Sequence, residues 1–419
     1  MKNQLNYIDL FAGAGGLSEG FKKAGFNPIA HVEMDLAACL SLKTRVAYHH
    51  LKATNQFSTY EAYLKGDIDR DYLYDEFVPK EELDSVINLA LGEENNNAIY
   101  SKIDAQLQNK DVDLIVGGPP CQAYSLVGRS RSSDNMESDP RNHLYIQYAE
   151  YLKRYQPKMF VFENVLGLLS ANGGSYFKLM VDLFAKLGYE VQKYVLNASD
   201  FGVLQNRRRV VLIGYKKELN LNLPDFKPNQ KINTTVSSVF EDLPILQTGE
   251  GIDKYVKYAT KTNDYLKEMG IRNGINVLTQ HISRPHKDYD KEIYRIAINL
   301  WDNEKKRLNY NDLPERLIKH NNTTSFFDRF KVVAANEKSS QTVVAHIAKD
   351  GHYYIHPDIK QNRSITVREA ARLQSFPDDF YFEGVQEGKN RTAAFKQIGN
   401  AVPPLMAKEI AKNIKNLLL

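Results

Sequence analysis

The sequence predicts an α/β protein built on a doubly wound parallel sheet. Four short apolar runs, each followed by glycine, acidic or proline residues, are expected to be strands: Tyr7–Phe11, Pro28–Val32, Val112–Val116 and Met159–Phe162. Amphipathic stretches such as Leu17–Ala24 and Leu144–Arg154 lie between them and are expected to be helices. Two later runs, Tyr189–Asn197 and Arg209–Tyr215, are interpreted as a closing pair of strands, for which antiparallel pairing is one option.

This pattern divides the chain into two unequal parts. Residues 1–222 are expected to form the α/β domain, with residues 46–100, which are Tyr-rich and acidic, as a helical insertion. From residue 223 the pattern becomes irregular, and residues 223–385 are interpreted as a second, smaller domain. Residues 386–419, which include the helical pattern at Leu405–Leu418, are expected to return to the first domain.

Composition excludes several classes of protein. Hydrophobic residues make up 42% of the chain and charged residues 25%, as in ordinary globular domains. There is no run of 18 apolar residues and no apolar signal segment after Met1, so we expect neither a membrane span nor export. The two cysteines, Cys39 and Cys121, exclude a disulfide framework and fit a reducing cytoplasm.

Charge is unevenly distributed along the chain. The net charge is +4, yet residues 45–103 carry −5, which leaves +9 on the remainder. A surface that binds phosphates would use that remainder and avoid the acidic segment. A solvated surface with uneven charge explains the same counts equally well.

A glycine-rich turn follows the first expected strand. The residues from Phe11 to Leu17 read Phe-Ala-Gly-Ala-Gly-Gly-Leu, where glycines let backbone amides approach a ligand at the start of a helix. Glu33 ends the second strand, 20 residues after Gly13, where an acidic side chain can accept hydrogen bonds from ribose hydroxyls. The pattern fits any adenosine-containing cofactor. Ser18 replaces the last glycine of the dinucleotide fingerprint, and a purely structural turn is the alternative.

The third strand leads into a candidate nucleophile. Cys121 follows Gly117-Gly118-Pro119-Pro120, a rigid lead that a core cysteine would not need. Ligands of such sheets bind at the carboxyl ends of the strands, which is where Cys121 is expected. Cys39, on an expected helix, is interpreted as an inert buried residue.

Two further polar groups stand at strand ends. Glu163 follows an apolar strand, where burial could keep its carboxyl protonated for use as a general acid; a helix-terminal carboxylate is the alternative. In Gln205-Asn206-Arg207-Arg208-Arg209, strand alternation sends Arg207 and Arg209 to one face. That pair could hold a phosphate or a base oxygen, or belong to a solvated charge run.

Taken together, these segments resemble the DNA cytosine-5 methyltransferase family, in particular its prokaryotic restriction-modification members. Seven matches occur in family order: Phe11–Gly16, Glu33, Pro119–Gln122, Glu163–Val165, Gln205-x-Arg207-x-Arg209, Arg363–Gln374 and Gln397–Pro404. The resemblance implies the S-adenosylmethionine-dependent methyltransferase fold in residues 1–222, a DNA target-recognition domain with its supporting motif in residues 223–385, and a C-terminal segment that folds back beside the first motif.

The resemblance also implies site residues and partners. Those for S-adenosylmethionine are Phe11, Ala12, Gly13, Gly15, Gly16, Leu17, Glu33, Met34, Asp104, Pro119, Asn400, Ala401 and Val402, with Asp104 expected at the adenine amino group. Those for catalysis are Cys121, Glu163, Arg207 and Arg209, and no metal is expected. The product cofactor would be S-adenosylhomocysteine. Double-stranded DNA is the expected partner, a cognate restriction endonuclease a further one, and the protein is expected to be monomeric.

The family chemistry requires these groups together. Cys121 would attack carbon 6 of a cytosine, Glu163 would protonate nitrogen 3, and Arg209, supported by Arg207, would hold the base oxygen. The target must leave the duplex to be reached. Ser125–Arg141 resembles the loop that closes over flipped DNA, with Arg129 and Arg131 as candidate phosphate contacts; an ordinary surface loop is the alternative.

Other functions explain less of the sequence. The tRNA-directed branch of the family carries a Cys-Phe-Thr motif in its target region, but no cysteine follows Cys121. A nicotinamide-dependent oxidoreductase leaves Pro-Pro-Cys-Gln and Glu-Asn-Val unexplained, and a DNA-binding protein without activity needs neither Cys121 nor Glu163. His346, His352 and His356 are too irregularly spaced to favour a metal site. The recognised DNA sequence cannot be read from residues 222–345.

Overall fold

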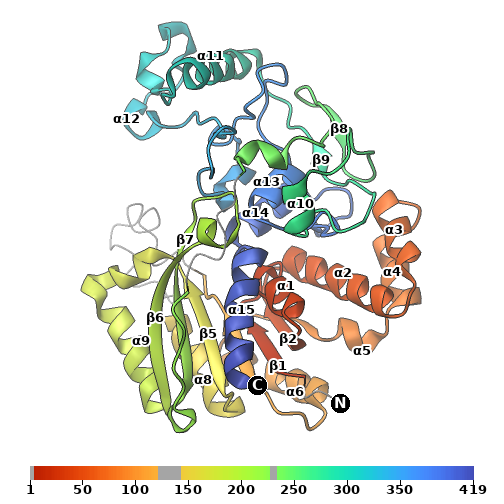
Figure 1. Cartoon of the computed structure of the whole chain (residues 1–419), viewed down its shortest axis with the longest axis vertical. Helices are drawn as coiled ribbons and strands as arrows, with labels where there is room; N and C mark the ends of the chain where they lie inside the picture. The colour runs from red at the N-terminus through yellow and green to blue at the C-terminus, as the bar shows by residue number, and fades with distance from the viewer. Residues whose placement is uncertain (1–3, 121–142, 227–233) are drawn as a thin grey trace.

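The computed structural model describes residues 4–120, 143–226 and 234–419. Figure 1 shows a sheet with its covering helices in the lower half and a second, less regular domain above it. Cys121 and the Ser125–Arg141 segment, with Arg129 and Arg131, lie outside the described residues. Their roles therefore stay predictions.

A seven-stranded sheet confirms the expected α/β class. Its order is β3-β2-β1-β4-β5-β7-β6. Strands β1 to β5 are mutually parallel, and β7 pairs antiparallel with both β5 and β6, so the closing pair is antiparallel. The strands are β1 Asn6–Leu10, β2 Asn27–Glu33, β3 Val86–Asn88, β4 Leu114–Gly117, β5 Met159–Asn164, β6 Tyr189–Asn197 and β7 Arg208–Lys216. Two short strands, β8 Gly251–Ile252 and β9 His281–Ile282, pair separately in the second domain.

The helices fall between these strands and through the second domain. Those of the first domain are α1 Gly16–Lys23, α2 Leu36–Ala53, α3 Phe57–Lys65, α4 Arg70–Phe77, α5 Lys80–Leu83, α6 Glu93–Leu107, α8 Leu144–Tyr155 and α9 Ser175–Lys186. The later ones are α10 Asp264–Glu268, α11 Asp288–Glu304, α12 Thr323–Phe326, α13 Val367–Leu373, α14 Arg391–Asn400 and α15 Pro404–Leu418.

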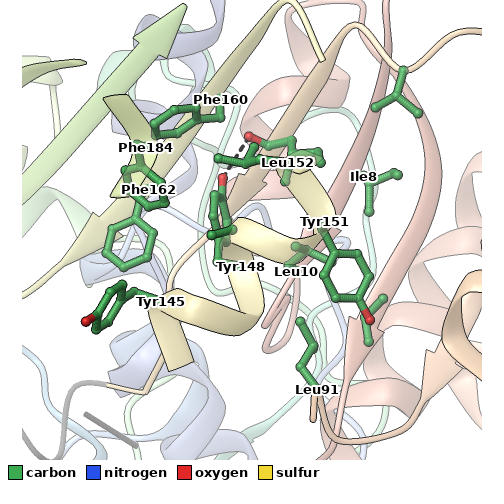
Figure 2. Close-up of a cluster of buried hydrophobic side chains, with 14 of the residues drawn as sticks. Ile8, Leu10, Leu91, Tyr145, Tyr148, Tyr151, Leu152, Phe160, Phe162 and Phe184 are labelled. Atoms are coloured by element: carbon green, nitrogen blue, oxygen red, sulfur yellow. Dashed lines mark hydrogen bonds between the residues drawn. The ribbon is translucent and has the colours of Figure 1, made fainter. Parts of the chain in front are cut away.

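Alternating side chains of the strands build two cores, one on each face of the sheet. On one face Ile115 and Phe160 pack with α6, α8 and α9, and on the other Leu114 and Val116 pack with α1 and α15. Figure 2 shows Tyr148 of α8 among the aromatic side chains of the first core. Its hydroxyl donates to the backbone oxygens of Ile115 (3.0 Å) and Val161 (3.1 Å), which satisfies a polar group in this core.

The expected helical insertion is not wholly helical. Residues 46–100 do contain α3, α4 and α5, but they also contain β3, which pairs with β2 through His31 opposite Val86. β3 has only three residues, too few to produce an alternating apolar pattern. The helices α3 and α4 bury tyrosines against Tyr381, and the Tyr60 hydroxyl donates to the backbone oxygen of Asp379 at 2.7 Å. The insertion thus joins the two domains.

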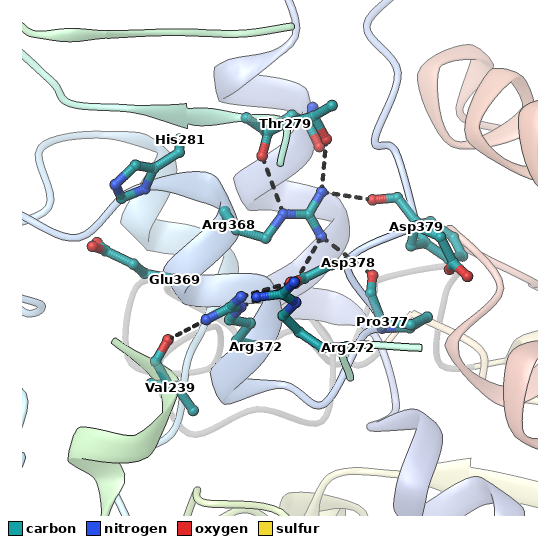
Figure 3. A network of polar contacts seen from close by, with 12 residues as sticks. Val239, Arg272, Thr279, His281, Arg368, Glu369, Arg372, Pro377, Asp378 and Asp379 are labelled. Atoms are coloured by element: carbon teal, nitrogen blue, oxygen red, sulfur yellow. Dashed lines mark hydrogen bonds and ion pairs between the residues drawn. The ribbon is translucent and has the colours of Figure 1, made fainter. Parts of the chain in front are cut away.

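The second domain has little regular structure and is held by buried arginines. Thr366 and Glu369 form a capping box at the start of α13, and Glu369 also binds Arg363. Arg372 binds Asp378 at 2.6 Å (Figure 3). It also binds Asp242 at 2.6 Å. Burial without such partners would be costly for every one of these charges.

The C-terminal segment returns to the first domain later than residue 386. Phe395 and Ile398 of α14 pack in the core of the second domain with α13. The return is made by α15, which covers α1 so closely that a Cβ on Gly20 would lie 2.4 Å from the Cβ of Ala407. Only glycine allows this approach.

Replacing Arg372 with alanine should strongly destabilise the protein. Asp242 and Asp378 would lose their shared cation inside the core, and truncating one member of a buried ion pair costs roughly 3–5 kcal/mol. Urea unfolding followed by circular dichroism measures the loss. The control is Arg316→Ala, whose arginine is exposed and paired with Glu292, and whose unfolding midpoint should not move. Equal midpoints for the two variants would contradict the importance of the buried network.

Candidate active site

The glycine turn lies at the carboxyl end of β1 and is braced by Glu33. Phe11, Gly13 and Gly15 all have positive φ angles, of 56°, 55° and 82°. The Glu33 carboxylate accepts the N–H of Gly13 and the N–H of Asp35, each at 2.8 Å. Burial raises the pKa of Glu33, while these backbone N–H groups oppose the rise. Each carboxylate oxygen has a second lone pair, so a further donor can still bind.

Several other residues expected around the cofactor lie beside this turn. Ala12 accepts the N–H of Gly15 at 2.9 Å, which closes the turn at the start of α1, where Leu17 is buried. Past Glu33, the side chains of Met34 and Leu36 are 66% and 46% exposed, an unusual state for apolar residues at a strand end. They offer an uncovered apolar surface next to the Glu33 carboxylate.

The last family motif meets the first one. A Cβ on Gly16 would lie 2.2 Å from the backbone oxygen of Val402 and 3.1 Å from the Cβ of Ala401. Asn400 ends α14 with its side chain exposed. The structure therefore brings residues 400–402 to the glycine turn from almost 400 residues away in sequence.

The buried Glu163 and the largely buried Arg209 form an ion pair at the ends of β5 and β7. The Glu163 Oε1 atom lies 2.8 Å from Arg209 Nε. Desolvation by burial raises the pKa of Glu163, and the positive charge of Arg209 only partly offsets this. A Cβ on Gly118 would lie 2.8 Å from Glu163 Oε2, so the segment before Cys121 passes directly over the carboxyl.

Asn164 fixes that segment in place. Its amide donates to the backbone oxygen of Pro119 at 3.1 Å, and its side-chain oxygen accepts the N–H of Val165 at 2.9 Å. Pro119 is buried and lies two residues before Cys121 in the sequence. No role was expected for Asn164 from the sequence, although its position in Glu-Asn-Val marks it as part of the site.

Arg207 does not lie in the site as a catalytic group. Its guanidinium is fully buried and donates to three backbone oxygens, those of Val343 (2.7 Å), Gly399 (3.0 Å) and Ala401 (2.9 Å). Alternation along the chain does turn Arg207 and Arg209 inward and Arg208 outward, but Arg207 reaches the C-terminal turn rather than Glu163. Its expected catalytic role is corrected to a positioning role.

Gln205 was likewise missed as a positioning residue. Its side-chain oxygen accepts the N–H of Val343 at 2.9 Å, and its amide donates to the backbone oxygen of Leu373 at 3.0 Å. It therefore joins the entrance of β7 to the second domain. The irregular segment around Val343 has no sequence pattern from which its hydrogen bond with Gln205 could be predicted.

Asp104 does not lie at the glycine turn, so the prediction that placed it there beside an adenine amino group is wrong. It lies near the C-terminal end of α6, which leads into the amino end of β4, at the sheet edge opposite the glycine turn. Its half-exposed carboxylate pairs with Arg154 at 2.5 Å and accepts the hydroxyl of Tyr155 at 3.0 Å. These contacts are those of a surface ion pair.

The three histidines considered for a metal have other contacts. His346 lies 3.3 Å from an Arg329 nitrogen, His352 lies 2.8 Å from the Tyr294 hydroxyl, and His356 lies 3.6 Å from Glu369. Among residues 4–120, 143–226 and 234–419, no group of three His, Cys, Asp or Glu side chains is arranged to hold a metal. Within the same residues no helix is both long and apolar enough to cross a membrane.

Known proteins resemble this chain over nearly its whole length. The family model described as C-5 cytosine-specific DNA methylase matches residues 5–70 and 88–416. The type II methyltransferase M.Bpa9945I of Bacillus paralicheniformis is 42% identical, with 98% of each chain covered. The type II methyltransferase M.DdeI of Desulfomicrobium norvegicum is 31% identical, and the match covers 98% of this chain and 88% of the M.DdeI chain.

Solved structures agree in fold. A prophage-encoded E. coli protein assigned as a DNA modification methyltransferase matches with a TM-score of 0.67 at 24% identity, covering 99% of both chains. The Entamoeba histolytica methyltransferase EhMeth matches with a TM-score of 0.55 at 16% identity, covering all of both chains. With the family model spanning most of its length and M.Bpa9945I so similar throughout, the chain belongs to the C-5 cytosine-specific DNA methylase family and is a DNA (cytosine-5)-methyltransferase of the restriction-modification type.

Proposed function

We propose that the protein transfers a methyl group from S-adenosylmethionine to carbon 5 of a specific cytosine in double-stranded DNA, through a covalent adduct of Cys121 with the flipped-out base. The observation that carries this is the buried Glu163–Arg209 pair directly under the Gly118-Pro119 segment that leads to Cys121. A protonated carboxyl and a guanidinium at that place are suited to a pyrimidine ring.

The residues at the glycine turn fit the cofactor. Glu33 retains acceptor capacity for ribose hydroxyls, Met34 and Leu36 expose apolar surface for an adenine ring, and a Cβ built on Gly13 would meet only open space. S-adenosylmethionine, when bound, supplies an electrophilic methyl group on a sulfonium. Asn400, Ala401 and Val402 would close the same pocket from the other side.

The chain's own groups would activate the base. The Cys121 thiolate forms a bond to carbon 6, and Glu163 gives its proton to nitrogen 3 as electron density moves into the ring. Arg209 holds the oxygen at carbon 2. After carbon 5 has gained its methyl group, its proton passes to water and the sulfur–carbon bond breaks, so that Cys121 leaves as a thiolate. Nitrogen 3 then returns its proton to Glu163, and the aromatic ring is restored.

The wider setting follows from this activity. DNA is the substrate, and closure of Ser125–Arg141 over the duplex, with Arg129 and Arg131 on phosphates, belongs to the same proposal. A cognate restriction endonuclease, a monomeric state and a cytoplasmic location are further predictions. None of them is needed for the chemistry itself.

Bisulfite sequencing of DNA from cells that express the protein should reveal methylated cytosine at one recurring sequence. Cys121→Ser should abolish this methylation while leaving cofactor binding nearly intact, because the nucleophile is lost but the glycine turn is not. Cys39→Ser is the matched control: its buried sulfur donates to the backbone oxygen of Glu33, a bond that serine keeps. Turnover by the Cys121 variant, or label entering tRNA rather than duplex DNA, would contradict the proposal.

Glu163→Gln should lower kcat by about 100-fold or more, the usual contribution of a general acid. Because burial raises the pKa of Glu163, the wild-type carboxyl stays protonated to a higher pH than usual. The wild-type rate should therefore fall as pH rises through that pKa, and this limb should vanish in the variant. Single-turnover rates across pH measure both effects. Glu190→Gln, on the exposed face of β6, should keep the wild-type profile, and an unchanged profile for Glu163→Gln would refute the assignment.

Glu33→Ala should weaken S-adenosylmethionine binding about tenfold or more, since a hydrogen bond to a charged group is worth roughly 1.5–3 kcal/mol. Isothermal titration calorimetry measures the dissociation constant. Glu33 also braces Gly13, so thermal unfolding is measured in parallel to separate loss of binding from loss of folding. An unchanged dissociation constant in a folded variant would argue against the ribose contact.

A further inference from the structure

A pocket lies where the two domains meet, and neither Glu163 nor Arg209 lines it. It has a volume of about 170 Å³, far more than one water needs. Asn206 lines it from the first domain, and Trp301, Arg307, Glu337 and Ser339 line it from the second. Asn206 precedes Arg209 by three residues, so at roughly 3.3 Å per residue their Cα atoms are at most about 10 Å apart.

Trp301 and Arg307 give the pocket the means to hold a nucleotide. Trp301 is the single tryptophan of the chain and lies, partly exposed, in the last turn of α11. Tryptophan rings stack on bases of any sequence. Arg307 is exposed and makes no ion pair with any side chain in the described part of the protein, so its guanidinium is available to a phosphate.

Glu337 makes the pocket more selective than a phosphate site. A carboxylate repels a phosphate but accepts hydrogen bonds from the exocyclic amino groups of adenine, cytosine or guanine. The hydroxyl of Ser339 adds a donor and acceptor beside it. An aromatic ring, an acceptor and one arginine together match a base with its own phosphate.

The walls of the pocket are held in place by contacts between the domains. The N–H of Asn206 donates to the backbone oxygen of Ser340 at 2.9 Å, and the N–H of Ser340 donates to the backbone oxygen of Leu204 at 3.0 Å. The Thr342 hydroxyl donates to the backbone oxygen of Asn206 at 2.6 Å. A site preformed in this way needs little ordering when a ligand enters.

We infer that this pocket receives one nucleotide of the substrate duplex near the target cytosine, with its base against Trp301, its amino group on Glu337 and its phosphate on Arg307. The inference rests on the proposed function, because it presupposes a DNA duplex at the domain junction. It assigns Trp301, Glu337 and Arg307 to recognition of the sequence that flanks the target.

Trp301 itself reports the contact, because no other tryptophan contributes to the emission. A duplex carrying the methylated sequence found by bisulfite sequencing should change the Trp301 emission in step with binding measured by fluorescence anisotropy of labelled DNA. Abasic sites placed at successive positions around the target should abolish the change at one position. Unchanged emission at saturating DNA would overturn the inference and leave the proposed function intact. If no duplex is bound or methylated, the proposed function fails first.

Variants separate recognition from folding. Trp301→Ala and Arg307→Gln should each raise the KM for DNA about tenfold with little change in kcat or cofactor affinity, and Trp301→Phe should recover most of the loss. Glu337→Gln should relax the base preference at the position found by the abasic scan. The control is Lys306→Gln, an exposed neighbour that pairs with Glu304 and does not line the pocket, with a change of at most about twofold. Equal effects of Arg307→Gln and Lys306→Gln would overturn the inference.

Discussion

The arrangement of the active site depends on the buried guanidinium of Arg207. Its three bonds to backbone oxygens of residues 343, 399 and 401 join the entrance of β7 to the second domain and to the turn against Gly16. Gln205, two residues earlier, bonds to residues 343 and 373. A short stretch of chain thus sets the position of Arg209 and, through the C-terminal turn, the packing against the glycine turn. A buried charge tolerates such a place only when carbonyl dipoles surround it.

The same use of arginine explains how the second domain keeps its form with so little regular structure. Arg363, Arg368 and Arg372 are fully buried and bind carboxylates or backbone oxygens through several nitrogens each. A lysine offers a compact point charge and could not satisfy separated acceptors with a planar fork. Across the domain junction Arg45 binds Glu19 at 2.7 Å and Asp379 at 2.9 Å, which extends the pattern to the insertion side of the molecule. Networks of this kind hold only if every member is satisfied.

The features that could be predicted from the sequence are those that a local pattern of apolar and polar residues determines. Glu33 and Glu163 each follow an apolar run, so their place at the carboxyl edge of the sheet could be read directly, and the structure puts them there. The three-residue strand β3 is too short to leave a pattern. The prediction for Asp104 was wrong for a topological reason. A helix that leads into the next parallel strand ends at the amino edge of the sheet, whereas the glycine turn lies at the carboxyl edge. Asp104, in the last turn of α6, is therefore far from the glycine turn. The role of Arg207 depends on partners 136 to 194 residues away, which no local pattern contains.

Arg207 and Arg209 show how two residues of the same kind, on the same side of the chain, come to serve different ends. The guanidinium of Arg207 donates to backbone oxygens and is buried from solvent. Arg209 uses Nε for Glu163 and Nη1 for the backbone oxygen of Arg208 within the described residues. A guanidinium has five N–H donors, so in the proposed mechanism Arg209 holds the carboxyl and a base oxygen together. A lysine could approach both only by sharing one ammonium, and the planar set of donors that this mechanism uses would be lost.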